Sequence, residues 1–226
     1  MATERLQVES RVASYAALAD PVRLRIVDHL ELGDASPGEL QTMVGCTSNL
    51  LAHHLGVLER ARLITRHRSE ADRRRTYVRL VPGALDGLQR REVVPVPRVL
   101  FVCTANSARS QLAAALWAEA STVPVMSAGT HPADKVAAGA ARTARKHGLR
   151  LTQVGPQALA DVLAINDFVV AVCDNAYEEL APERVRVHWS VPDPVRIGTA
   201  AAFDAAHDDL ATRVAQLAPR FTNIAS

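Results

Sequence analysis

The sequence predicts two domains, a mainly α-helical one followed by an α/β domain with a central parallel sheet. The first part of the chain contains several helical patterns and ends in an arginine-rich hairpin, whereas the second part alternates short apolar strands with helices. Between them, a Val-Pro-Val-Pro segment favours an extended conformation. We therefore place the domains at residues 1–92 and 99–226 and a linker at 93–98.

Length and composition favour a soluble protein of a reducing compartment. The 226 residues are 48% hydrophobic and carry a net charge of only +2, which is enough apolar material for sizeable cores. The three cysteines are too few and too widely spaced for a secreted disulfide framework. The amino-terminal residues do not resemble a signal peptide, and no apolar run is long enough to span a membrane. We expect a cytoplasmic protein that has no membrane partner.

The first domain contains signals for four helices and a two-stranded hairpin. Asp20 is placed to cap a helix that has a proline in its first turn, and Ser36 with Glu39 forms a capping box. Two short segments of alternating apolar and polar residues follow the helices. The expected elements are helices at 10–18, 21–32, 37–45 and 48–60 and strands at 63–68 and 76–80. This order is that of a winged helix-turn-helix.

The helix from residue 48 and the hairpin are the candidates for DNA contact. Such a helix lies in the major groove and presents polar side chains to base edges, while arginines of the hairpin contact phosphates. An arginine cluster of this kind is also typical of a solvated surface hairpin. The candidate DNA-binding residues are Gln41, Ser48, Asn49, His53, Arg66, Arg68, Arg73, Arg74 and Arg75. The expected partner is double-stranded operator DNA.

Three stretches of this domain, 17–26, 51–58 and 73–77, resemble the ArsR-type metalloregulatory repressors. The resemblance covers about residues 10–88 and implies a homodimeric repressor that leaves its operator when a metal or metalloid binds. The cysteine pair of the arsenite-binding members is missing here, because Cys46 stands alone, and the zinc-type His and Asp pattern is missing as well. The sequence therefore predicts no metal site and leaves the inducer open.

The second domain alternates strands and helices, which is typical of a parallel sheet with helices on both faces. Ligands of such folds bind at the carboxyl ends of the strands. The expected strands are at 99–102, 123–127, 168–172 and 185–188, and the expected helices are at 111–120, 137–147, 157–161 and 201–217.

A loop of small and polar residues follows the first of these strands and leads into a helix. Backbone N–H groups of such a loop and of the helix N-terminus converge on an anion, and Arg109 adds a bidentate fork. The same positive field favours Cys103 as a thiolate nucleophile. Asp193, held between two prolines, is the best candidate to protonate a departing oxygen. The residues of this oxyanion cradle are Thr104, Ala105, Asn106, Ser107, Ala108 and Arg109.

Residues 98–220 resemble the low-molecular-weight tyrosine phosphatase superfamily and, within it, the arsenate reductases. The matching motifs are at 103–111, 127–130, 172–173, 188–189 and 193–194. The resemblance implies a phosphatase-type oxyanion loop with Cys103 as the nucleophile, Arg109 as the oxyanion binder, Ser110 as a thiolate stabiliser and Asp193 as the general acid. The string from Asn106 to Gln111 is nearer to the reductases than to the phosphatases.

The cysteines differ from those of the thioredoxin-coupled reductases, which relay a disulfide through three thiols. Cys173 matches the middle one, but Leu180 stands where the third is expected. We expect no bound cofactor. Either an external thiol, such as mycothiol or glutathione with a glutaredoxin, completes the cycle, or a Cys103–Cys173 disulfide is reduced directly, for example by thioredoxin. In the alternative interpretation, Cys173 is an inert core cysteine.

The sequence thus predicts a DNA-binding regulator of the arsenic response fused to an arsenate reductase, which takes arsenate or a phosphate-like oxyanion. Two alternatives stay open. The first is protein tyrosine phosphatase activity, against which the aromatic content of 4% argues. The second is a non-catalytic domain that senses an oxyanion or oxidation at Cys103 and controls the DNA-binding half.

Overall fold

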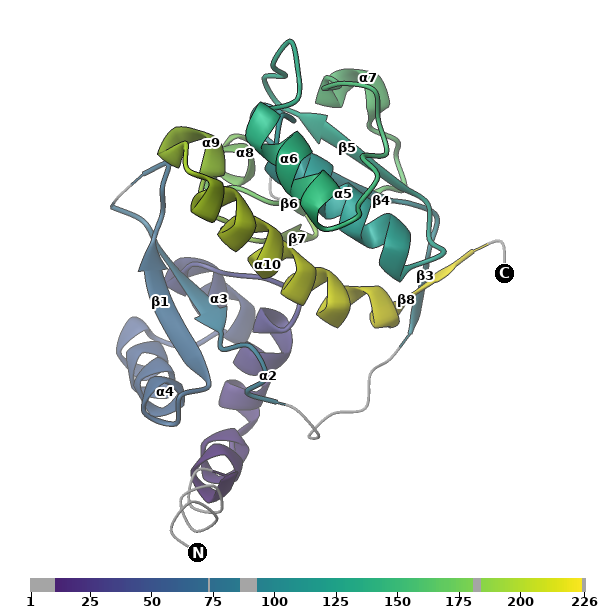
Figure 1. The fold of residues 1–226 in the computed structure, drawn as a ribbon. Coiled ribbons are helices and arrows are strands. Elements are labelled where there is room, and N and C mark those ends of the chain that lie inside the picture. The colour runs from purple at the N-terminus through teal and green to yellow at the C-terminus, as the bar shows by residue number, and fades with distance from the viewer. Residues whose placement is uncertain (1–10, 73, 86–92, 181–183, 225–226) are drawn as a thin grey trace, which may run out of the picture. The chain divides into compact units, whose positions relative to one another are not determined.

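The chain folds into two compact units, Met1–Gln89 and Arg90–Ser226, which are described separately (Figure 1). The computed structural model describes residues 11–72, 74–85, 93–180 and 184–224. Arg73 of the predicted DNA-binding set lies outside these ranges. Within them, no helix is both long enough and apolar enough to cross a bilayer.

The first unit has the predicted winged helix-turn-helix order. Residues 11–18 are helical. The elements that follow are α2 (Pro21–Leu30), α3 (Pro37–Val44), α4 (Ser48–Arg60), β1 (Ile64–Arg68) and β2 (Thr76–Leu80). The two strands pair antiparallel, with Ile64 opposite Leu80 and Arg68 opposite Thr76. The prediction of helices followed by a hairpin is therefore confirmed, although α2 ends two residues before the predicted end.

Local hydrogen bonds fix where these helices begin. The Asp20 carboxylate accepts the N–H groups of Val22 and Arg23 at 2.9 Å each, and Ser36 exchanges two bonds with Glu39 in the predicted capping box. Between α3 and α4, Gly45 adopts a φ of 71°, which costs glycine nothing. The turn of the helix-turn-helix is thus specified by residues that satisfy the helix ends.

One side of each helix of this unit builds a shared apolar core. Burial of one such aliphatic side chain stabilises a fold by about 1.5–3 kcal/mol. The two adjacent histidines of α4 lie on opposite sides of this core boundary: His54 is buried, whereas His53 is exposed. The outer face of α4 is therefore open to solvent, with polar side chains and the apolar Leu50 exposed on it. The core includes Ile26, Val27, Leu30, Leu40, Leu51, Leu55, Leu58 and Val78.

The second unit is built on a four-stranded sheet in the order β5-β4-β6-β7, in which every pair is parallel. The strands are β4 (Val99–Cys103), β5 (Val125–Gly129), β6 (Phe168–Ala171) and β7 (Val187–His188). All five residues of the central strand β4 are buried, which explains its continuous apolar run. Phe101 of this strand contacts Trp117 and Trp189, with ring centroids 5.8 and 5.6 Å away. The predicted α/β fold is confirmed.

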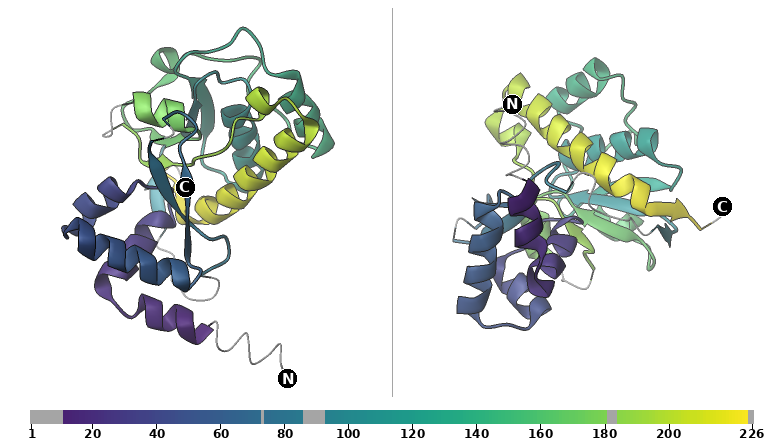
Figure 2. Two further views of the ribbon diagram at one scale, coloured as in Figure 1. Left: turned by 90° about the vertical axis from the view of Figure 1, so that its left-hand side faces the viewer. Right: turned by 90° about the horizontal axis from the view of Figure 1, so that it is seen from below.

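The three longest helices of this unit, α5 (Arg109–Ala120), α6 (Ala138–Lys146) and α10 (Ala200–Leu217), gather on one face of the sheet (Figure 1). Both views in Figure 2 show α10, in yellow, beside the teal helices α5 and α6. Shorter elements are α7 (Leu159–Val162), α8 (Asp174–Glu179), α9 (Pro194–Ile197) and the 3-10 helix η1 (Ala218–Arg220). The sequence patterns missed α8 and α9, because helices of six and four residues are too short to show a periodicity.

The segment interpreted as a linker at 93–98 is partly a strand. Val94–Val96 forms β3 and pairs in parallel with β8 (Phe221–Asn223), with Pro95 opposite Thr222. Proline suits an edge strand, because it lacks an N–H group but holds an extended backbone. Its partner strand lies at the other end of the domain sequence, so no local pattern predicts this pairing.

Gly129, the last residue of β5, lies against the backbone of the loop that follows β4. A Cβ atom at this position would lie 2.6 Å from the carbonyl oxygen of Thr104 and 3.0 Å from the amide nitrogen of Asn106. Both atoms belong to hydrogen-bonded backbone, which yields less easily than a flexible side chain. Only glycine therefore allows the loop to lie in this position.

We predict that Gly129→Ala displaces the loop and lowers the free energy of unfolding by about 1–3 kcal/mol, as overpacking does in other proteins. The matched control is Gly155→Ala, because the position of its added methyl group has no neighbouring atom within 4 Å. Urea unfolding of both variants measures the difference. Equal stabilities of the two variants would contradict the close approach described here.

Candidate active site

The loop after β4 turns its carbonyl groups toward the segment 130–137. In a trans peptide the N–H group points opposite to the carbonyl, so these bonds direct the N–H groups of the loop inward. No described side chain caps the first turn of α5, which leaves its N–H groups directed to the same place. The loop is therefore built as an anion cradle. The carbonyl–amide pairs are Cys103 with Thr130, Thr104 with His131, Ala105 with Ala133 and Ser107 with Ala137, at 2.8 to 3.1 Å.

Asn106 holds the loop in a conformation that is uncommon for residues other than glycine. Its φ of 47° lies in the left-handed region. The side-chain amide donates to Ser110 Oγ at 2.8 Å and to Ser127 Oγ at 2.9 Å, and its carbonyl oxygen accepts the Gln157 N–H at 2.8 Å. These bonds offset a backbone cost of about 1–3 kcal/mol. Asn106 thus braces the cradle.

This brace also fixes the direction of the Ser110 hydroxyl. Because Ser110 Oγ accepts a hydrogen bond from Asn106, its own proton can be donated to Cys103 Sγ, which lies 3.1 Å away. The backbone N–H of Asn106 donates to the same sulfur at 3.2 Å. A sulfur that accepts two hydrogen bonds is the arrangement that a thiolate nucleophile requires. The structure therefore brings together Cys103 and Ser110, two of the predicted site residues.

Arg109 links the cradle to the loop that carries Asp193. Its Nη1 donates to the carbonyl of Val191 at 3.0 Å, and its Nη2 forms an ion pair with Asp193 Oδ2 at 3.0 Å. The other carboxylate oxygen of Asp193 accepts the N–H of Val195 at 3.0 Å and so caps α9. The predicted oxyanion binder and the predicted proton donor are thus in contact, although they are far apart in the sequence.

Cys173 lies beside the same loop. It is the N-cap residue of α8, its sulfur accepts the Ala176 N–H at 3.4 Å, and Thr104 Oγ1 lies 3.6 Å from that sulfur. Burial raises the pKa of the Cys173 thiol, and so does the neighbouring Cys103 sulfur, while Arg109 acts in the opposite direction. Cys103 and Cys173 are both free thiols. The two sulfur atoms and Arg109 therefore share one electrostatic environment.

Several polar side chains that support the site were missed by the sequence analysis. The Ser127 hydroxyl donates to the side-chain oxygen Oε1 of Gln153, and this bond fixes the hydroxyl that accepts from the Asn106 amide. His188 Nε2 lies 3.1 Å from Asp174 Oδ1, and its ring stacks on Tyr177 with centroids 4.1 Å apart. Ser127 and His188 both lie within motifs that the family resemblance marked, whereas Gln153 lies in an irregular segment that gives no signal.

The predicted base-reading residues lie at the start of the helix-turn-helix. The Ser48 hydroxyl, in the first turn of α4, donates to Gln41 Oε1 of α3 at 3.0 Å. Asn49 and His53 follow on α4, and both are exposed. Ser48, Asn49 and His53 are therefore open to solvent, and Gln41, which is half-buried, contacts the first of them.

The predicted phosphate-binding arginines lie on the β1–β2 hairpin, and those described are all exposed: Arg66, Arg68, Arg74 and Arg75. Two of them already contact acids, because Arg66 Nε lies 2.8 Å from Glu59 Oε1 and Arg74 Nε lies 3.1 Å from Asp72 Oδ1. Exposed ion pairs of this kind are weak, so phosphates can replace the carboxylates.

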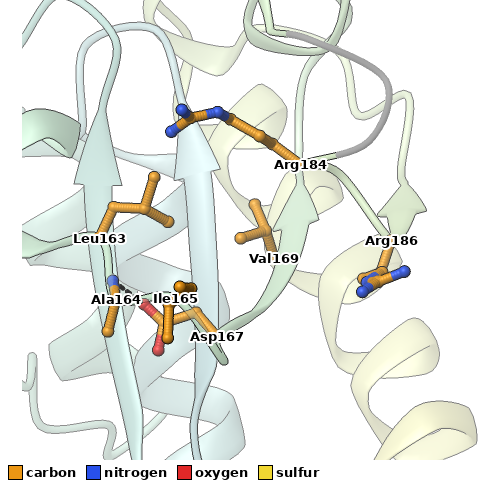
Figure 3. Close-up of a pocket in the computed structure, with 7 residues that line it drawn as sticks. All are labelled: Leu163, Ala164, Ile165, Asp167, Val169, Arg184 and Arg186. Carbon is orange, nitrogen blue, oxygen red and sulfur yellow. Dashed lines mark hydrogen bonds between the residues drawn. The ribbon is translucent and has the colours of Figure 1, made fainter.

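A cavity of about 340 Å³ lies at the start of β6 (Figure 3). The cradle follows the end of the parallel neighbouring strand β4, so the cavity and the cradle lie at opposite edges of the sheet. Asp167 in its wall is held by Arg98 at 2.5 Å. No predicted site residue is among those that line this cavity, so it is separate from the predicted site. The lining residues are Leu163, Ala164, Ile165, Asp167, Val169, Arg184 and Arg186.

Comparison with known proteins identifies the first unit as a helix-turn-helix domain. The profile of a helix-turn-helix domain family matches residues 18–67. The transcriptional repressor SdpR of Bacillus subtilis is 33% identical over 54 residues, which cover 24% of this chain and 60% of that protein. The chain thus spans about three fifths of the length of this curated relative.

The second unit is similar to solved structures of phosphatases and reductases. An arsenate reductase from Archaeoglobus fulgidus is 27% identical, with a TM-score of 0.47, and the match covers 54% of this chain and 98% of that one. The YwlE arginine phosphatase from Geobacillus stearothermophilus is 25% identical, with a TM-score of 0.49, over 54% of this chain and 91% of that one. The profile of the low molecular weight phosphotyrosine protein phosphatases matches residues 98–225, which include the whole cradle, and the chain belongs to this family.

Proposed function

We propose that the second unit is a thiol-dependent arsenate reductase and that the first unit binds operator DNA to regulate an arsenic response. The observation that carries the proposal is the second thiol beside the cradle, where Cys173 Sγ lies 3.6 Å from Thr104 Oγ1. A phosphatase needs one nucleophile, an oxyanion binder and an acid. A reductase needs two electrons as well, and two thiols supply these when they form a disulfide.

The first step resembles phosphoryl transfer. Arsenate binds to the inward N–H groups and to Arg109, and it thereby competes with Asp193 for the guanidinium group. The Cys103 sulfur forms a bond to arsenic while one arsenic–oxygen bond breaks. Asp193, which takes up a proton once arsenate has displaced it from Arg109, donates that proton to the departing oxygen, and the oxygen leaves as water. Arsenic is still pentavalent at this point.

The second step is the reduction. The Cys173 thiolate attacks the Cys103 sulfur, a sulfur–sulfur bond forms, and the sulfur–arsenic bond breaks. The electron pair of that bond stays on arsenic, which leaves as trivalent arsenite. Since Leu180 stands where a third relay cysteine would be, an external thiol such as mycothiol, glutathione with a glutaredoxin, or thioredoxin reduces the Cys103–Cys173 disulfide directly.

Phosphatase activity is the second candidate, and the family match over residues 98–225 favours it. Cys103, Arg109 and Asp193 suffice for hydrolysis of a phosphate ester, and arsenate and phosphate have nearly the same geometry. The two candidates differ in their need for Cys173.

The first prediction of this proposal separates these candidates by substituting the three cysteines one at a time. With arsenate, NADPH and reconstituted mycothiol, glutathione or thioredoxin systems, Cys103→Ser and Cys173→Ser both lose turnover by at least about a thousandfold, because each removes a thiol that the cycle consumes. With an aryl phosphate, only Cys103→Ser loses activity. Cys46→Ser is the matched control, since Cys46 lies in the other unit.

Arsenate turnover that survives in Cys173→Ser would contradict the two-thiol mechanism. Hydrolysis of the aryl phosphate without arsenate turnover in any system would establish the phosphatase instead. If neither activity is found, and operator affinity changes with arsenate or peroxide in wild type but not in Cys103→Ser, the domain is a sensor.

The second prediction concerns pH. Burial and the Cys103 sulfur place the pKa of Cys173 above its ordinary value of 9.0, so little of the attacking thiolate exists at neutral pH. Arsenite release in a single turnover should therefore accelerate as the pH rises through and beyond 9.0. Aryl phosphate hydrolysis, which does not use Cys173, should lack this alkaline acceleration. Identical pH profiles for the two reactions would refute this role of Cys173.

The third prediction concerns the DNA-binding half, tested on an operator selected from random duplexes. Arg68→Ala should weaken binding to all sequences alike and lower the slope of log affinity against log salt by about 1, because it removes one phosphate contact. Asn49→Ala should instead lose about 1–3 kcal/mol of discrimination at one base position. Arg150→Ala, an exposed arginine of the other unit, is the control. Loss of affinity in this control equal to that in Arg68→Ala would argue against a groove-bound hairpin.

A further inference from the structure

Two histidines and an aspartate gather where the end of α6 meets α10. His147 is the C-cap residue of α6, and His207 and Asp208 are neighbours within α10. One donor atom from each of the three side chains lies within 4.8 Å of the other two. The closest pair is His207 Nδ1 and Asp208 Oδ1, at 2.9 Å. The three side chains therefore present a compact set of nitrogen and oxygen donors.

The two imidazole rings are aligned with each other. Their centroids are 3.7 Å apart and their planes differ by 22°, so the rings of His147 and His207 stack on each other. His207 is nearly buried, with 7% of its surface exposed, whereas the side chain of Asp208 is 72% exposed. The cluster thus has one fixed side chain and an open side through which an ion can enter.

The surroundings of the cluster suit a positive ion. Asp204 Oδ1 lies 3.8 Å from His147 Nε2, and the other carboxylate oxygen binds Lys146 Nζ at 2.7 Å. The carbonyl groups at the C-terminus of α6 add partial negative charge.

We propose that His147, His207 and Asp208 form a binding site for a divalent transition-metal ion, with Zn²⁺ as the best match. Two imidazole nitrogens and a carboxylate oxygen are a known zinc ligand set, and water completes a tetrahedron. Such a site needs donor atoms about 3.4 Å apart. Rotation of the exposed side chains of His147 and Asp208 closes the remaining distance.

The ion would connect two helices that are distant in the sequence. It joins the end of α6 to the middle of α10, on the face of the sheet where both helices pack with α5 (Figure 1). Asp204 then orients His147, as outer-shell carboxylates do in other metal sites. The sequence contains no ligand-spacing motif that predicts this site, because His147 and His207 come from separate helices.

The test is a zinc titration of the reduced, tag-free full chain against a chromophoric chelator. Wild type should bind one Zn²⁺ at this site. His147→Gln and Asp208→Asn, whose exposed side chains leave the fold intact, should each weaken that binding by about tenfold or more. His131→Gln is the control, because His131 also contacts a carboxylate, Glu179 at 3.2 Å, but belongs to no three-residue cluster of donors among the described residues.

Two further readouts separate this site from the thiols. Zn²⁺ should raise the melting temperature of wild type but not of His147→Gln, since only the folded state assembles the ligands. Co²⁺ should give the visible spectrum of nitrogen and oxygen ligands without a thiolate charge-transfer band. Zinc affinity that is the same in wild type, His147→Gln and Asp208→Asn would overturn the proposal, as would a thiolate band that disappears in Cys103→Ser.

Discussion

The hydrogen bonds of the Asn106 side chain are the interaction on which the rest of the site depends. They hold a φ of 47° in the cradle, and the same amide sets the Ser110 hydroxyl so that it can donate to Cys103. With this conformation in place, the loop carbonyls reach the segment 130–137 and the N–H groups turn inward. Gly129 is the matching constraint on the other side, because a side chain there would collide with the loop backbone.

The parallel sheet explains how residues distant in the sequence meet at one edge. Cys103 ends β4, Cys173 follows the adjacent strand β6, and Asp193 lies on the loop after β7. Parallel strands deliver their carboxyl ends to the same edge, which is where such folds place their chemistry. The choice between hydrolysis and reduction then depends on whether the second thiol takes part, while the cradle serves either reaction.

Local patterns predicted much of this architecture, because they arise from interactions between near neighbours. The Asp20 cap, the Ser36 capping box and the buried run of β4 all have this origin. The pairing of β3 with β8 and the cluster of His147 with His207 were not predictable, and no local pattern, only the family resemblance, brought Arg109 and Asp193 to one site. These contacts depend on tertiary packing between segments that carry no common local signal.

The most direct test of the two-thiol account is peptide mapping after a single turnover. The reduced protein is mixed anaerobically with one equivalent of arsenate in the absence of any external reductant, and the remaining thiols are then alkylated. The account predicts one arsenite released per chain and a disulfide between Cys103 and Cys173, with Cys46 alkylated. Arsenite release with Cys173 still alkylated, or no arsenite at all, would contradict it.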